Sequence, residues 1–306
     1  MSQKSRKFAY AMMIFVVIAW GFDYVAAKFV LEAIAPLPLV CIKYGIGCIV
    51  LLAIKTVRDR RFVFRVKDLP LLIACALFGE VFYYACEYGA MAYLPVSIIS
   101  IVLAFVPVVS VILERFIWKR AANPKIWVGI AISIFGVALV IGGDFSALFS
   151  GSMIGYLLVF GAVFSWNIYN FCTAGLTKRY RPLDLTLYQT LCTTLLALPF
   201  LLHNLPPATA FTGVPLAMVL YLGIVSEGIG FMIYVNAIDK LGPTPCALFS
   251  NMLPVSSAFF GWMLLGERIV PLQIAGGAVV VAAGIMVIWE KGKLDEKRLH
   301  DARVSG

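Results

Sequence analysis

Charged side chains are scarce in this sequence. Asp, Glu, Lys and Arg make up 13% of its 306 residues, and there are only two histidines. Hydrophobic residues make up 62%, and the mean hydropathy of +0.94 is far above that of soluble globular domains. The shortage of charge therefore excludes a water-soluble fold and predicts an integral membrane protein.

Signatures of catalysis and of metal binding are missing as well. The sequence has no GxSxG, no HExxH, no Cys–His pairing and no nucleotide-binding loop, and its seven cysteines lie in apolar runs without CxxC spacing. We therefore expect no enzyme, no metal and no cofactor, and we expect the cysteines to be reduced.

Long apolar runs recur along the chain, each of about 18–25 residues, which is the length that crosses a bilayer as a helix. They predict an all-α membrane protein, because a spanning helix satisfies its own backbone hydrogen bonds. The ten predicted transmembrane helices are residues 8–29, 37–55, 69–92, 96–118, 126–143, 152–175, 184–203, 214–238, 244–265 and 271–289.

The net charge is +9, and the basic residues are distributed unequally between the two sides of the membrane. If the amino terminus is cytoplasmic, 22 of the 25 Lys and Arg residues fall on the cytoplasmic side, Arg268 falls outside, and Lys28 and Lys43 lie in or at the membrane. This is the positive-inside pattern, and it predicts a protein of the cell membrane with both termini cytoplasmic. Basic residues spread in this way do not form a nucleic-acid surface.

The two halves of the chain match each other. Residues 77–143 align without a gap with residues 147 positions further on, and the amino-terminal part aligns at an offset of 146. The informative matches are Glu80 with Glu227, Pro107 with Pro254, Ser110 with Ser257, Pro124 with Pro271, Gly129 with Gly276, Tyr10 with Tyr156, Trp20 with Trp166 and Pro36 with Pro182. We expect five-helix repeats at 8–143 and 152–290 and a tail at 291–306; since five is odd, the repeats are inverted, as in secondary transporters.

Several short motifs lie in or next to these helices. They are Trp20-Gly21, Lys43 following Pro38, Pro107-Val108, Pro254-Val255, and LLGE at 264–267 followed by Pro271. In these residues the chain resembles the EamA-type family of the drug/metabolite transporter superfamily. Two positions depart from the pattern: Arg120 stands opposite Glu267, and Lys43 stands where family members often carry arginine.

That resemblance implies a ten-helix inner-membrane transporter. It implies a central cavity lined largely by helices 1, 3, 4, 6, 8 and 9, and the movement of small metabolites, amino acids or drugs.

Acidic residues near the middle of two apolar runs are the main candidates for function. A carboxylate at the bilayer centre costs about 2.5–3.5 kcal/mol on insertion scales, so such a residue usually faces water, a partner or a substrate. Glu80, Tyr84 and Glu87 share one helix face by their spacing, and Glu227, Phe231 and Tyr234 form the matching face. This pattern suits an organic cation, coupling protons or, alternatively, a purely structural role.

Other candidates extend this site. Trp20 and Trp166 add aromatic surface, and Lys43 either pairs with Asp23 or an acid of the third helix or extends to the outer surface. Pro107 and Pro254 are candidate hinges, with static kinks as the alternative. Glycines in the fifth and tenth helices serve as scaffold or as a homodimer face.

The sequence thus predicts a secondary transporter in the lipid bilayer that works by alternating access. We expect it to export a small organic solute, namely a metabolite, an amino acid or a cationic or aromatic drug, with Glu80 and Glu227 binding either the solute or protons. A non-transporting membrane protein, such as a receptor, scramblase or scaffold, is the alternative.

Overall fold

Helix is the only regular structure in the part of the chain that the computed structural model describes. The described residues are 3–58, 61–90, 93–94, 99, 102–103, 105–106, 109–110, 113, 116, 123–140, 153–250, 252–265 and 271–304. The predicted helix at 96–118 lies largely outside them, as does Pro107. The count of ten helices and the hinge at Pro107 therefore stay predictions.

Six helices among the described residues are long and apolar enough to cross a membrane. They cover Lys7–Leu31, Pro36–Arg58, Val66–Ala90, Met153–Leu176, Pro182–His203 and Gly213–Leu241. Shorter apolar helices cover Pro124–Gly136, Leu253–Leu264 and Ile274–Val287. Each of the nine segments overlaps one predicted span, so the all-helical membrane architecture is confirmed.

Prolines begin five helices in the described part of the chain, one of which is α12 (Pro243–Ser250). The other four helices are α2 (Pro36–Arg58), α7 (Pro124–Val140), α9 (Pro182–His203) and α14 (Pro271–Val304). The first helical position suits proline, because its missing N–H would have no partner within the helix. The prolines of these four helices are the two pairs matched in the sequence repeat, so equivalent residues begin equivalent helices.

Two of the spans contain a π-helical segment at their centre, which the sequence did not predict. The third span consists of α3 (Leu69–Ala76), η2 (Leu77–Phe82) and α4 (Tyr83–Ala90), and its counterpart consists of α10 (Gly213–Tyr221), η5 (Leu222–Gly230) and α11 (Phe231–Leu241). Glu80 lies in η2 and Glu227 lies in η5. Single π turns inside α-helices occur frequently at functional sites.

Hydrogen bonds link each π segment to the other half of the chain. Ser165 of α8 (Met153–Leu176) donates to the carbonyl oxygen of Phe78 in η2. Trp20 of α1 (Gln3–Leu31) donates through Nε1 to the carbonyl oxygen of Ser226 in η5, at 3.3 Å. The first helix of each half thus bonds to the π segment of the other half.

The predicted helix at 244–265 is interrupted, which corrects that prediction. The structure has α12 (Pro243–Ser250) followed by α13 (Leu253–Leu265), with a turn at Met252. Pro254 lies in the first turn of α13, where a missing N–H is tolerated, and its ring would clash with the carbonyl of residue 250 in a continuous helix. Gly242 permits the preceding turn with φ of +84°.

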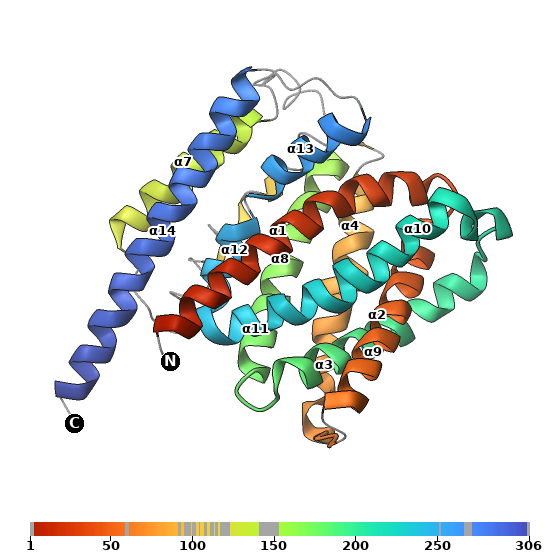
Figure 1. The fold of residues 1–306 in the computed structure, drawn as a ribbon, viewed down its shortest axis with the longest axis horizontal. Coiled ribbons are helices and arrows are strands. Elements are labelled where there is room, and N and C mark those ends of the chain that lie inside the picture. The colour runs from red at the N-terminus through yellow and green to blue at the C-terminus, as the bar shows by residue number, and fades with distance from the viewer. Residues whose placement is uncertain are drawn as a thin grey trace.

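The helices pack into a bundle with one pair at its side. In Figure 1, α7 and α14 run beside each other along one edge, and the start of α1 and the far end of α14 lie toward the same corner. Within the bundle, α2 packs against α9, α4 against α8, and α1 against α11 and α13. A central core joins these helices and contains most of their large buried side chains.

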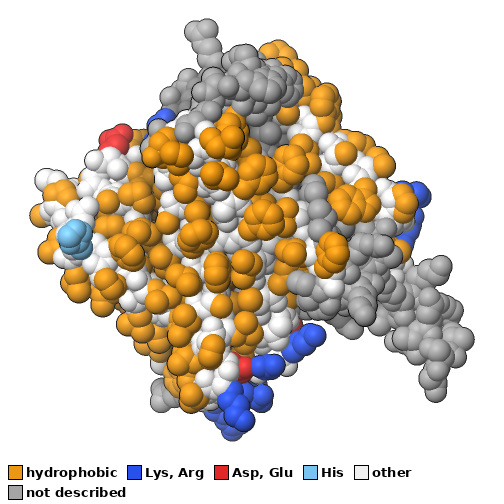
Figure 2. All heavy atoms as spheres, turned by 180° about the vertical axis from the view of Figure 1, so that it is seen from behind, with side chains coloured by type: hydrophobic (Ala, Val, Ile, Leu, Met, Phe, Trp, Pro, Cys, Tyr) orange, Lys and Arg blue, Asp and Glu red, His pale blue; other side chains and the backbone are white. Residues whose placement is uncertain are grey.

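The outer surface is predominantly apolar. Figure 2 shows hydrophobic side chains spread over most of one face, with Lys and Arg gathered at its edges. Among the exposed side chains are Ile49, Leu157, Leu195 and Phe164, each more than half exposed. Such a large continuous apolar surface matches contact with lipid rather than with water.

Candidate functional site

Four acidic residues lie buried at the centre of the bundle. They are Asp23 from α1, Glu80 from η2, Glu87 from α4 and Glu227 from η5, and none is more than 9% exposed. Buried carboxylates are costly unless a cation, a proton or hydrogen-bond donors offset the charge. The partners of each acid therefore define what the site can bind.

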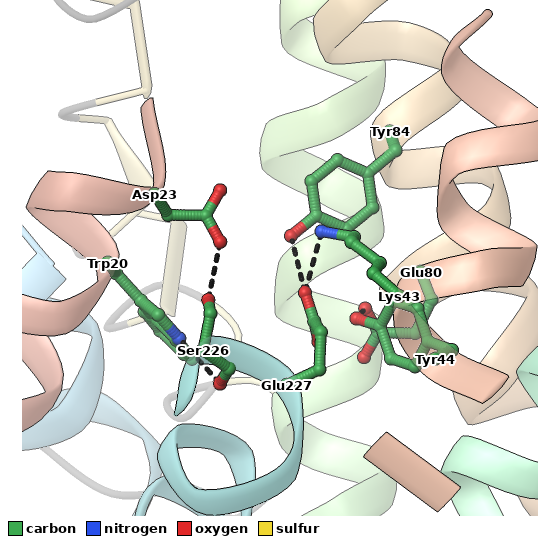
Figure 3. Close-up of polar contacts among 8 residues, drawn as sticks. All are labelled: Trp20, Asp23, Lys43, Tyr44, Glu80, Tyr84, Ser226 and Glu227. Carbon is green, nitrogen blue, oxygen red and sulfur yellow. Dashed lines mark hydrogen bonds and ion pairs between the residues drawn. The ribbon is translucent and has the colours of Figure 1, made fainter. Parts of the chain in front are cut away.

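Glu227 forms an ion pair with Lys43 of α2. The Lys43 Nζ lies 2.6 Å from Glu227 Oε1, and both side chains are completely buried. Tyr84 donates to the same oxygen at 3.5 Å, and its ring lies beneath the ammonium, with Nζ 3.7 Å from the ring centroid. Figure 3 shows the lysine and the tyrosine hydroxyl converging on Glu227.

This pairing differs from the two arrangements expected for Lys43. The lysine extends neither to the outer surface nor to a direct ion pair with Asp23 or with an acid of the third helix. Its partner comes from the other half of the chain. The sequence holds no signal for this choice, because it depends on how α2 packs against η5.

The other three acids accept hydrogen bonds from hydroxyl groups. Tyr44 donates to Glu80, and Ser226 donates to Asp23. Glu87 accepts from Tyr83 at 2.9 Å and from Tyr24 at 3.3 Å through the same oxygen. These hydroxyls stabilise the carboxyl groups without adding positive charge. The four donors were not among the predicted site residues, because a hydroxyl in an apolar helix has no sequence signal of its own.

Aromatic rings surround the carboxylates. Trp20 and Trp166 meet edge to face with centroids 5.9 Å apart, and Phe231 and Tyr234 each lie 5.0 Å from Trp20. Tyr169 stacks on Trp166 at 5.2 Å. The centre thus places packed aromatic rings beside buried carboxyl groups, and ring faces of this kind attract cations in general.

The structure thus brings most of the predicted residues to one place. Lys43, Glu80, Tyr84 and Glu227 share one cluster, and Trp20, Trp166, Phe231 and Tyr234 form the adjoining aromatic cluster. Glu87 lies apart in the group it forms with Tyr24 and Tyr83, although Tyr83 also reaches Trp166 with centroids 5.1 Å apart. Pro254 lies at the start of α13.

In the described residues, no three His, Cys, Asp or Glu side chains are grouped as ligands of a metal ion would be.

A second polar cluster lies at the predicted cytoplasmic end. Asp68 forms an ion pair with Arg179 and accepts from the Tyr180 hydroxyl at 3.0 Å, and that hydroxyl accepts from the backbone N–H of Arg65. Burial raises the pKa of Tyr180, so the hydroxyl stays protonated at neutral pH and can donate. Nearby in sequence, Lys55 and Asp184 form a buried pair at 2.5 Å that joins α2 to α9.

Gly129 and Gly136 of α7 allow close contact with α14 within the chain. A Cβ at Gly136 would lie 2.9 Å from the Val280 backbone nitrogen and 3.0 Å from the Gly276 carbonyl oxygen, and one at Gly129 would lie 2.3 Å from Val287. These contacts correspond to the scaffold role expected for the glycines. A homodimer through these helices stays a prediction.

Comparison with known proteins gives consistent matches along both halves. Residues 7–142 and 153–289 each match the model of the EamA-like transporter family. The uncharacterized transporter YoaV of Bacillus subtilis is 21% identical over 90% of this chain and 94% of its own. A probable amino-acid metabolite efflux pump of Escherichia coli is 25% identical over 90% of this chain and 93% of its own.

Two further matches support the same picture. A probable terminal-alkyne amino-acid exporter of Streptantibioticus cattleyicolor is 28% identical over 73% of this chain and 74% of its own. One solved crystal structure superposes with a TM-score of 0.78 over 94% of this chain and 99% of that one, at 18% identity. At this identity, the superposition supports the fold alone.

Proposed function

Because the chain belongs to the EamA-like transporter family, we propose that it exports a small amine-bearing metabolite, such as an amino acid, by alternating access. The observation that carries the proposal is the buried Lys43–Glu227 pair among aromatic rings at the centre of the bundle. A carboxylate set in such surroundings binds an ammonium group. The names of relatives as amino-acid exporters and metabolite efflux pumps support the solute class and the direction.

The two repeat-matched acids differ in their partners, and we assign them different roles. Glu227 already faces an ammonium, so it suits the amine of the solute. Glu80 accepts from the Tyr44 hydroxyl, and no lysine or arginine of the described chain lies within 4 Å of it. A buried carboxyl group with a hydroxyl partner suits a coupling proton.

Transport by purified protein in proteoliposomes tests this proposal. The solute panel is L-phenylalanine, L-lysine, tyramine and putrescine, measured with and without a pH gradient. We expect transport of at least one of these compounds. We expect Glu227→Gln to lower its rate by about tenfold or more, since an amide does not replace a buried carboxylate that pairs with an ammonium.

Glu80→Gln separates coupling from solute contact. We expect this variant to bind and exchange the solute but to lose stimulation by the pH gradient. Glu290→Gln is the matched control, because Glu290 is similarly buried but lies just beyond the apolar part of α14, where it accepts a hydrogen bond from Asn123, and should transport normally. Wild-type rates in both Glu80→Gln and Glu227→Gln would overturn the proposal, as would a wild type that transports nothing in the panel.

A further inference from the structure

The ammonium of Lys43 occupies a site with the make-up of a binding site for an organic cation. It contacts the carboxylate of Glu227 at 2.6 Å, lies 3.7 Å from the centroid of the Tyr84 ring and 5.5 Å from that of Tyr44, and is shielded from solvent. A carboxylate beside aromatic faces attracts any ammonium group, whether it belongs to the protein or to a ligand. The position that a substrate amine would take is thus already filled by a side chain.

The centre holds more carboxyl groups than this one lysine can pair with. Asp23 and Glu80 are buried at the same centre (Figure 3), whereas Glu87 lies further along α4 in its group with Tyr24 and Tyr83. Two ammonium groups can therefore each face a carboxyl group of their own. Glu80 and Asp23 are the acids toward which a displaced Lys43 can turn.

We propose that Lys43 stands in for the substrate ammonium when the carrier is empty. This inference rests on the proposed transport of an amine. An arriving amine takes the carboxylate of Glu227, and Lys43 shifts toward the neighbouring acids. When the amine leaves, Lys43 returns to Glu227.

This substitution has a consequence for the transport cycle. A buried carboxylate without a partner is strongly destabilising, so an empty carrier with a bare Glu227 reorients slowly across the membrane. With Lys43 in place the empty carrier has the same ion pair as the loaded one. Lys43 thus permits the empty return step that net export requires, whereas exchange of one amine for another does not need that step.

Gln189 provides a matched control on the partner helix. It is the sequence-repeat counterpart of Lys43, is equally buried, and donates to Thr173 at 2.8 Å instead of forming an ion pair. Its replacement alters a buried polar group at the equivalent position of the other half and leaves the Glu227 site untouched.

The experiment compares net efflux with exchange in proteoliposomes loaded with the panel member that the wild type transports fastest. Net efflux is measured into solute-free buffer, and exchange into buffer that contains the same compound. For Lys43→Gln we expect the ratio of net efflux to exchange to fall by about tenfold or more. Lys43→Arg should restore net efflux, and Gln189→Leu should keep the wild-type ratio.

A double variant keeps the inference testable if Lys43→Gln fails to fold. Lys43→Gln with Glu227→Gln removes both charges, so no acid is left unpaired, and its net efflux and exchange should be equal. A lower net efflux than exchange in the double variant, or an equal loss of both in folded Lys43→Gln, would overturn the inference alone. A wild type that transports no member of the panel would overturn the proposed function, and this inference with it.

Discussion

Hydroxyl groups determine how the buried acids are held. Tyr44, Tyr83 and Ser226 donate to Glu80, Glu87 and Asp23 in turn. Each hydrogen bond satisfies one acceptor position of a carboxyl group but does not neutralise its charge, so the group can still pair with a cation or take up a proton.

Gly79 allows the close approach of Tyr169 beside Glu80. A Cβ at this position would lie 2.3 Å from Cδ2 and 2.9 Å from Cβ of the tyrosine, so Gly79→Ala must displace the ring and its helix. We expect the substitution to destabilise the protein by about 1–3 kcal/mol. The measurement is the Tm in detergent.

The control for this experiment is Gly175→Ala. Nothing lies within 4 Å of a Cβ at Gly175, so its Tm should equal or exceed that of wild type. Equal Tm values for the two variants would contradict the packing described here.

Many charged and aromatic residues of the site were predicted from the sequence, whereas the residues that donate hydroxyl hydrogen bonds were not. Glu80, Glu227 and Lys43 stand out because ionisable side chains are rare in apolar helices. Tyr44 and Ser226 do not stand out, because tyrosine and serine are common in such helices as packing residues. Their roles depend on which helices face each other.

Close contact between α7 and α14 depends on Gly136. An alanine here would meet backbone atoms of Val280 and Gly276, which cannot move aside as a flexible side chain can. We expect Gly136→Ala to separate the two helices and to lower stability by about 1–3 kcal/mol. Cysteines are introduced at facing positions of α7 and α14. The measurement is the rate at which they react with a membrane-permeant thiol reagent.

Gly284→Ala is the comparison for Gly136→Ala. Gly284 lies on α14, but nothing is within 4 Å of its added Cβ, so reactivity there should match wild type. Unchanged reactivity in Gly136→Ala would show that the helices accommodate the methyl group.

At this scale the sequence predicted the positions of most helices but not their irregularities. Apolar length and the matched prolines located the beginnings of α2, α7, α9 and α14 to within a few residues. The π segments were missed, because a wider turn changes the backbone hydrogen bonds without changing the apolar pattern. The break before α13 was predicted only as a kink or hinge at Pro254 within one helix 244–265, whereas the structure has two helices.

For the molecule as a whole, the distribution of basic residues predicts the orientation of the termini. With an even number of spans, both ends lie in the cytoplasm. We therefore expect alkaline phosphatase, which is active only outside the cytoplasm, to be inactive when fused after Gly306. Fusion after Pro206, in the connection between α9 and α10, should be active and serves as the control.

Active fusions at both Pro206 and Gly306 would contradict the orientation of the carboxyl end and would imply an even number of spans between these two residues. The sequence supports this prediction through charge alone. The three-dimensional arrangement adds that α14 continues as one helix from Pro271 to Val304, well beyond its apolar part, which ends at Val287.

The ion pair at the centre breaks the equivalence of the two halves. Lys43 has a neutral counterpart, Gln189, so Glu227 is paired with a cation while its counterpart Glu80 is not. If the halves exchange roles between the inward-facing and outward-facing states, the site presents a different charge to each side of the membrane. The protein would then have different Michaelis constants for the same solute on its two faces, and its sidedness would follow from one residue of the repeat.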